Sequence, residues 1–307
     1  MAAELTIRAD GFTEMAFVGE TPWHRSGQKL EEGATIEQWQ VAAGMDWEIK
    51  STPVTYSAEL ASVHFERSIA DRKVLYRSDS GDALSVVSNG YHEVQPKEVL
   101  EFFRDLVDEN GFKIHTAGTL RGGKRMWALA ETGKYGEVSN GDGVGGFLLL
   151  STSADRTLAT TARFTTVRVV CNNTLTMAHG NNANTVSFNH MQRFDHARVK
   201  AQLGNAVESF GSFMNMARYL RERQIGGIKA EKFLVDLLSK IETPLVNGIG
   251  DHKPFDITKN RAAQEIGKLY AGDALGAHMA GHTAWGMLNA VTDIQLEIGR
   301  ASCRERV

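Results

Sequence analysis

The chain has 307 residues, of which 42% are hydrophobic and 23% are charged, and its formal net charge is −3. This composition is typical of an ordinary globular protein, and the length suits two domains. The sequence has no run of about 18 apolar residues, so we expect no membrane-spanning helix. The N-terminus lacks the apolar core of a secretory signal, which favours a cytoplasmic protein. The acidic balance argues against nucleic-acid binding through bulk positive charge.

The last residues, 297–307, break the apolar spacing of the helix predicted before them and end without a cap. Back-translated, EIGRASCRERV matches a common short-read sequencing adapter. We therefore expect that the natural sequence is cut near Leu296 and that this tail is not native; a contiguous read of the source gene that encodes the tail would contradict this. Without the tail, 31 basic and 35 acidic residues remain, a net charge of −4. Cys171 would then be the one cysteine, which excludes an internal disulfide.

The first half of the chain favours strands and short helices. Residues 1–34 are expected to form a loop held by Trp23. Thr35 and Gln38 make a capping box, which predicts a helix ending at Gly44. Pro53 predicts that the strand at 47–57 lies at an edge or carries a bulge. Further predictions are strands at 73–79 and 83–88 and a helix from Pro96 to Asn110.

Four more strands are predicted, at 112–120, 124–131, 145–153 and 157–170. After them the spacing of apolar residues changes to that of helices. Gly122 and Gly123 separate the first two of these strands, which is typical of a type I′ turn. The glycine-rich segment 141–147 precedes a strand instead of following one, so we interpret it as a flexible connection and not as a nucleotide-binding loop.

The second half follows helical spacing. Asp195 can cap a long helix, and helices are also predicted at 230–242, 258–271 and 283–296. The long helix carries apolar residues at heptad spacing, which favour a core-facing helix of a bundle and leave open a homo-oligomer through Val199, Leu203, Phe210, Phe213 and Leu220. The fold class is therefore predicted as α+β, with a mixed or antiparallel sheet in an N-terminal domain at 1–190 and a helical region at 191–296.

The joint between these halves is the segment 163–175, RFTTVRVVCNNTL. Cys171 at a helix start, with His179 or other histidines downstream, is a weak candidate nucleophile. A packed thiol is the simpler interpretation, because cysteine is often buried and no protease signature accompanies it. Asn172 or Asn173 suits a helix cap. No catalytic residue is assigned, and no cofactor or metal is expected.

Basic residues gather at three places: the Gly-Gly turn, the strand before Cys171 and residues 190–200, where Phe188 and Phe194 are interleaved. Cations for phosphates and rings for bases are what proteins use to bind single-stranded nucleic acid. The candidate contacts are Arg121, Lys124, Arg125, Arg163, Arg168, His190, Arg193 and Arg198. In a net acidic chain, a solvated turn and helix start with core phenylalanines is the simpler alternative.

Ordered segments over most of the chain carry a family resemblance. They are PWHRSG at 22–27, AGMDWEI at 43–49, LSVVSNGYHEVQPKEV at 84–99, TAGTLRGGKRMWAL at 116–129, TTVRVVCNNTL at 165–175 and TAWGMLNAVTD at 283–293. The chain resembles the phage/plasmid-like protein family, a group of unknown function from phages, prophages and plasmids. It departs from the family at ADRTL, residues 154–158, and in lacking a further C-terminal segment. The resemblance implies a mobile genetic element in a bacterial host, and no established activity.

Three functions follow as hypotheses. The first is a non-enzymatic accessory protein of a mobile element that binds single-stranded nucleic acid, which predicts salt-dependent binding lost on combining Arg168→Ala with Arg193→Ala. The second is an enzyme that uses Cys171, which full activity of Cys171→Ser would exclude. The third is a protein-interaction factor acting against host defence, which would recover a host or phage protein on co-purification.

Overall fold

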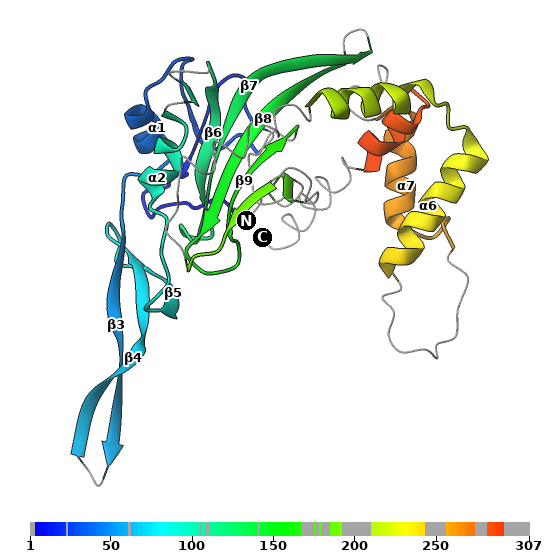
Figure 1. Ribbon diagram of the computed structural model, residues 1–307. Helices are drawn as coiled ribbons and strands as arrows, with labels where there is room; N and C mark the ends of the chain where they lie inside the picture. The colour runs from blue at the N-terminus through cyan, green and yellow to red at the C-terminus, as the bar shows by residue number, and fades with distance from the viewer. Residues whose placement is uncertain are drawn as a thin grey trace. The chain divides into compact units, whose positions relative to one another are not determined.

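The computed structural model describes residues 4–22, 24–60, 63–104, 106–107, 111–139, 142–166, 175, 178–179, 185–191, 210–242, 256–273 and 281–291. The chain divides into two compact units, residues 1–134 with 145–210 and residues 135–144 with 211–307. The first unit holds two β-sheets, and helices dominate the described part of the second (Figure 1). The α+β class and the strands of the N-terminal half are confirmed. The sequence places the domain boundary after residue 190, whereas the first unit extends to Phe210.

The larger sheet has seven strands in the order β10-β9-β8-β7-β6-β1-β2. It is mixed, because β1 and β2 are parallel whereas β1–β6, β6–β7, β8–β9 and β9–β10 are antiparallel. The strands are β1 (Met15–Phe17), β2 (Gln28–Lys29), β6 (Lys113–Leu120), β7 (Arg125–Ser139), β8 (Asp142–Ser153), β9 (Thr160–Thr165) and β10 (Thr185–Phe188). The sequence did not predict β10.

Both faces of this sheet are covered. Successive strand residues point to opposite faces, and Trp127 and Leu129 of β7 belong to one apolar cluster with Phe147 and Leu149 of β8. Leu175 and Ala178 pack on this same cluster. The alternate residues are buried as well, namely Met126, Ala128, Ala130, Leu148 and Leu150. We call the face that carries Trp127 and Leu149 the Leu149 face.

Two short helices, α1 (Ile36–Ala42) and α2 (Pro96–Glu101), contact each other. The predicted capping box of α1 is confirmed, since Thr35 and Gln38 bond reciprocally. The helix predicted from Pro96 to Asn110 is interrupted: α2 ends at Glu101, helical residues resume at Arg104 and include Leu106 and Val107, and residues 108–110 lie outside the described part of the chain. Phe102 and Phe103 follow α2, both fully buried, and the Phe103 N–H bonds to the carbonyl of Leu100, three residues back. Burying two adjacent rings favours this tighter turn over a continuous helix.

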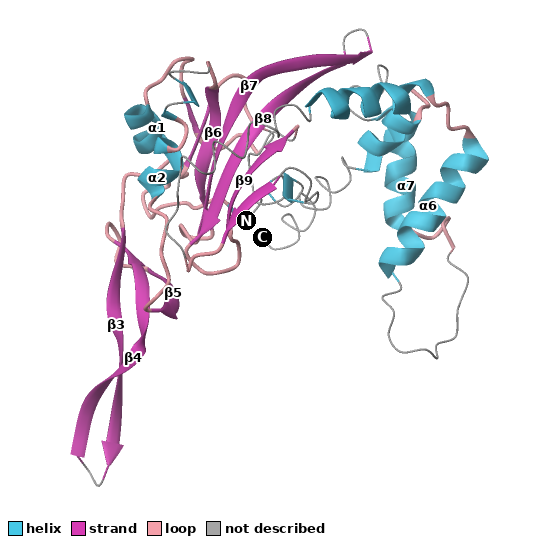
Figure 2. Cartoon of the chain, viewed as in Figure 1, coloured by secondary structure: helices cyan, strands magenta, loops and turns pink. Residues whose placement is uncertain are grey.

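The smaller sheet is antiparallel and has the order β3-β4-β5, with β3 (Ile49–Leu60), β4 (Val63–Arg77) and β5 (Ala83–Ser88). The prediction for Pro53 is confirmed, because β3 is an edge strand whose register shifts between Pro53 and Val54. β5 pairs only with residues 72–76 of β4, so β3 and β4 continue as a long two-stranded ribbon (Figure 2).

Three loop predictions are wrong. The loop predicted for residues 1–34 contains β1 and β2 of the large sheet, and Trp23 lies outside the described residues. Leu120 pairs with Arg125, so the turn has four residues, 121–124, and not the two of a type I′ turn. Its backbone is held by tertiary contacts, since the Gly123 N–H donates to Thr6 Oγ1 and a side chain at Gly123 would collide with Trp47 and Arg77. The glycine-rich residues from Asp142 onward are not a connection but the first part of β8.

The second unit contains a helical segment at 210–222, α6 (Gly227–Glu242), α7 (Arg261–Lys268) continued by η2 (Leu269–Asp273), and a helical segment at 284–291. α6, α7 and the segment 284–291 share one core, formed by Ala230, Leu234, Leu238, Ala263, Ile266, Met287 and Ala290. The predicted helical half is thus seen in part. None of the described helices is long and apolar enough to span a bilayer.

The described part of the heptad seam packs within the chain. Phe210 lies against Phe164 in the first unit, with ring centroids 5.8 Å apart, and Phe213 lies against Trp285 in the second, at 6.1 Å. Val199 and Leu203, and the helix start predicted at Asp195, lie outside the described residues.

Candidate functional site

A polar site interrupts the apolar Leu149 face of the large sheet. Residues directly opposite each other on neighbouring strands share a face, and β9 places Arg163 opposite Leu149 of β8 and Thr185 of β10. Ser151 of β8 lies two residues beyond Leu149 and therefore on the same face. Arg125 precedes Trp127 by two residues and shares its face too. With His179, which bonds to Ser151, these residues form what we call the buried arginine site: Arg125, Ser151, Arg163, His179 and Thr185.

Arg163 is the central residue of this site and is only 2% exposed. Its Nε is fully enclosed and has no hydrogen-bond partner within the described part of the chain. The hydroxyl of Thr185, across the strand pair, is also buried and unpartnered. Burial lowers the pKa of the Arg163 guanidinium, but arginine stays charged in proteins. An enclosed cation without a counter-charge costs several kcal/mol.

His179 lies beside this cation. Its Nε2 is 2.9 Å from Oγ of Ser151, which is fully buried. Desolvation, followed by the positive charges of Arg163 and Arg125, lowers the pKa of His179 to about 4. The imidazole is therefore neutral at pH 7. The site thus combines two guanidinium groups, a neutral imidazole and two hydroxyl groups, a donor set that fits an anion.

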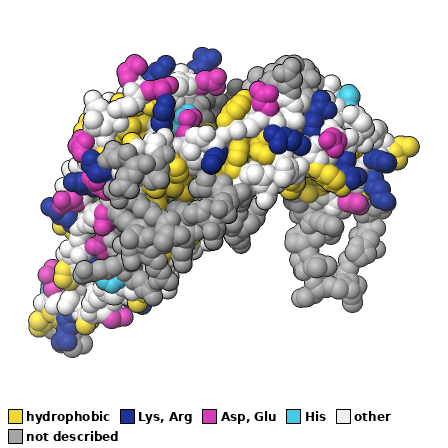
Figure 3. All heavy atoms as spheres, turned by 45° about the horizontal axis from the view of Figure 1, so that its top comes forward, with side chains coloured by type: hydrophobic (Ala, Val, Ile, Leu, Met, Phe, Trp, Pro, Cys, Tyr) yellow, Lys and Arg dark blue, Asp and Glu magenta, His cyan; other side chains and the backbone are white. Residues whose placement is uncertain are grey.

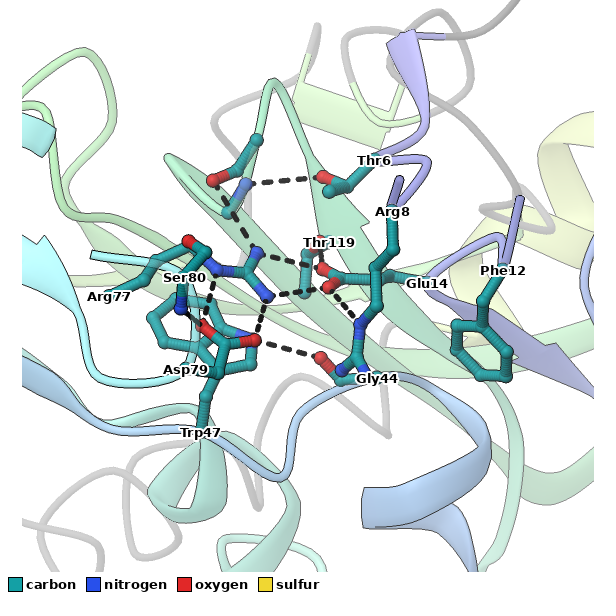
Figure 4. A network of polar contacts seen from close by, with 12 residues as sticks. Thr6, Arg8, Phe12, Glu14, Gly44, Trp47, Arg77, Asp79, Ser80 and Thr119 are labelled. Atoms are coloured by element: carbon teal, nitrogen blue, oxygen red, sulfur yellow. Dashed lines mark hydrogen bonds and ion pairs between the residues drawn. The ribbon is translucent and has the colours of Figure 1, made fainter. Parts of the chain in front are cut away.

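A second buried arginine shows how a structural pair is built. Arg77, at the end of β4, donates from Nη1 and Nη2 to the two carboxylate oxygens of Glu14, at 3.0 and 2.6 Å (Figure 4). It also bonds twice to Asp79 and stacks on Trp47 at 4.1 Å. Glu14 further accepts from Arg8 at 2.8 Å. This network joins the small sheet to β1 and satisfies its charges internally, which distinguishes it from the site at Arg163.

The residues predicted to bind nucleic acid have different surroundings. Arg121 is exposed and pairs with Glu4, with 2.6 Å between Nε and Oε2. Arg125 donates to Thr157 Oγ1 at 2.9 Å. Arg163 is buried, as described above. His190 stacks on Tyr91, with ring centroids 4.5 Å apart, and lies 3.1 Å from the carbonyl oxygens of His92 and Leu158.

The structure brings Arg125 and Arg163 to one face of the sheet, and Lys124, which precedes Arg125, is a half-exposed residue of the turn. Arg168, Arg193 and Arg198, together with Cys171, Asn172 and Asn173, lie outside the described residues. Sequence reasoning missed Ser151 and Thr185 and considered His179 only as a partner for Cys171. Strand alternation around Arg163 could have indicated Ser151, but the pairing with β10 has no local signal.

On the face shown in Figure 3, both basic and acidic side chains are present. A cleft of about 450 Å³ lies between α1 and β6. Its ionisable side chains lie in pairs: Arg104 with Glu37 at 2.7 Å, Lys113 with Glu32 at 3.3 Å and His115 with Glu131 at 3.2 Å. Among the described residues no group of three His, Cys, Asp or Glu side chains could hold a metal ion.

The chain was compared with models of known protein families. A family model described as Domain of unknown function (DUF932) matches residues 83–305. The chain belongs to this family. Within this DUF932 chain the buried arginine site falls inside the matched range, whereas Glu14 and Arg77 precede it. No match was found among curated proteins or among solved structures.

Proposed function

We propose that this DUF932 protein is a non-enzymatic binding protein whose ligand is single-stranded nucleic acid, with Arg163 contacting a phosphate group. One observation carries the proposal: a guanidinium that is 2% exposed has no carboxylate partner in the described part of the chain. A bound phosphate would supply the missing counter-charge and accept charge-assisted hydrogen bonds. The contrast with Arg77, which has two carboxylate partners, supports a ligand role for Arg163 over a structural one.

The second unit supports a nucleic acid as the source of the phosphate. Tyr219 is 52% exposed, and the guanidinium of Arg223 lies over its ring at 4.1 Å. Exposed rings paired with arginine are platforms on which unpaired bases stack, at ~1–3 kcal/mol per base. Neither residue was singled out from the sequence.

The proposal is tested by fluorescence anisotropy with a labelled single-stranded oligonucleotide at ~50 and ~200 mM salt. Binding that weakens with salt is expected, and Arg163→Met should weaken it about tenfold, because one charge-assisted contact contributes roughly 1.5–3 kcal/mol. The matched control is Arg121→Met, since Arg121 is exposed and already paired with Glu4; its affinity should change less than about twofold. Absence of binding at low salt would contradict the proposal.

We also propose that the protein serves a mobile genetic element, phage or plasmid, in the cytoplasm of a bacterial host. The family-like segments between residues 84 and 293 support this setting. Sequencing the genes beside the source gene tests it. Recombination genes as neighbours agree with nucleic-acid binding, whereas neighbours drawn only from chromosomal housekeeping operons would contradict a mobile origin.

A further inference from the structure

We infer that the group bound at Arg163 is a terminal phosphate monoester of the single strand and not an internal phosphodiester. This inference rests on the proposed function and adds which part of the nucleic acid enters the site. It depends on three properties of the buried arginine site: how enclosed it is, which donors it holds and how much positive charge it carries.

Enclosure limits the ligand to a chain end. Arg163 keeps only 2% of its surface exposed, the neighbouring Thr161 is 4% exposed and Ser151 is fully buried. An internal phosphodiester carries a sugar on two sides, so the strand would have to enter and leave beside the guanidinium. A terminal phosphate has one bridging oxygen, so only one strand would have to reach a guanidinium that is almost fully enclosed.

The donors match a group with three free oxygens. The guanidinium offers N–H donors in a planar fork, and its enclosed Nε has no hydrogen-bond partner within the described residues. The Thr185 hydroxyl, on the residue opposite Arg163, is a second unpartnered donor. The Ser151 hydroxyl is held by His179 at 2.9 Å and lies on the same face. A phosphate monoester presents three strong acceptor oxygens, whereas a phosphodiester presents two.

The charge matches a dianion. Arg163 and Arg125 are both close enough to lower the pKa of His179, although desolvation is the larger cause. Leu149, opposite Arg163, and Phe147, Leu175 and Ala178 of the same face make the surroundings apolar. In such surroundings opposite charges attract more strongly than in water. A phosphate monoester carries a charge of about −2 at pH 7, which favours it over a singly charged phosphodiester beside the Arg163 guanidinium.

The test compares one single-stranded oligonucleotide in three forms, with a 5′-phosphate, with a 3′-phosphate and with hydroxyl groups at both ends. We expect one phosphorylated form to bind wild-type protein at least about tenfold more tightly than the hydroxyl form. Arg163→Met should remove this difference, so that the variant binds the three forms alike. Arg163→Lys, which keeps the charge without the fork, should retain part of the difference. Circular dichroism confirms that each variant is folded.

Two results separate failure of this inference from failure of the proposed function. Equal affinity for all three forms overturns the terminal-phosphate inference and leaves nucleic-acid binding standing. Absence of binding to every form overturns the proposed function. In that case a 5′-mononucleotide and inorganic phosphate are tested separately for protection against thermal unfolding. Protection of wild type but not of Arg163→Met supports a phosphate monoester site for a small molecule. No protection of wild type overturns the inference as well.

Discussion

Arg163 on β9 lies directly opposite Thr185 on β10, and within the described residues neither the Arg163 Nε nor the Thr185 hydroxyl has a hydrogen-bond partner. Buried polar atoms in native proteins are nearly always satisfied. Two unsatisfied donors on facing residues therefore lower the stability of the ligand-free protein, because both are buried without a hydrogen bond. A ligand that accepts from both residues would recover that stability.

The first prediction concerns this cost. Arg163→Met should raise the free energy of unfolding of the ligand-free protein by ~1–3 kcal/mol, because replacing an uncompensated buried charge with an apolar side chain of similar length removes its desolvation penalty. Urea unfolding followed by circular dichroism measures the change. An unchanged or lowered midpoint would show that the guanidinium has a stabilising partner.

Arg77→Met is the matched second variant, and the opposite sign is expected. Removing Arg77 leaves the Glu14 carboxylate, which is fully buried, without its bidentate partner. Loss of one member of a buried pair typically costs ~3–5 kcal/mol. The same substitution at two buried arginines should therefore stabilise at Arg163 and destabilise at Arg77, and the same sign at both positions would contradict this interpretation.

Features that depend on neighbouring residues were predicted from the sequence, whereas features that depend on contacts between distant segments were missed. The Thr35 and Gln38 capping box and the bulge at Pro53 were predicted correctly, because both depend on neighbouring residues. The turn at 121–124 was predicted wrongly, because Thr6, Trp47 and Arg77 hold its backbone. Of the buried arginine site, the sequence indicated Arg125 and Arg163 as candidate contacts and His179 only as a partner for Cys171. Thr185, the residue opposite Arg163, lies on a short strand whose pairing no local pattern indicates.

A second prediction concerns acid stability. His179 has a folded pKa of about 4, below its ordinary value of 6.5, so between these pH values the unfolded chain takes up a proton that the folded protein does not. Its contribution is absent above pH 6.5, and stability is lost as the pH falls from 6.5 towards 4. The loss at pH 4 should reach about 2–3 kcal/mol.

His179→Gln isolates this contribution, because glutamine can still bond to Ser151 but does not titrate. The free energies of unfolding of wild type and His179→Gln are compared at pH 7 and pH 4. The variant should lose less stability than wild type over this range. Parallel pH profiles would show that His179 does not titrate with a lowered pKa.

A third prediction concerns the turn that joins β6 to β7. Gly122 and Gly123 both have positive φ, at 71° and 90°, so alanine at either position strains the backbone by ~1 kcal/mol. At Gly123 an added Cβ would also lie 2.8 Å from Trp47 and 2.9 Å from Arg77, whereas at Gly122 nothing lies within 4 Å. Gly123→Ala should therefore cost ~1–3 kcal/mol more than Gly122→Ala in urea unfolding. Equal costs would show that Trp47 and Arg77 do not pack against this turn.

The most direct test of the central claim, that Arg163 binds the phosphate of a nucleic-acid ligand, is the melting temperature of wild type and Arg163→Met with increasing concentrations of a terminally phosphorylated single strand. A ligand that binds only the folded state raises stability as its concentration exceeds the Kd, by ~2.7 kcal/mol at a hundredfold excess. The melting temperature of wild type should rise with ligand concentration, and that of Arg163→Met, higher at the outset, should rise much less. An equal rise in both proteins would contradict the claim.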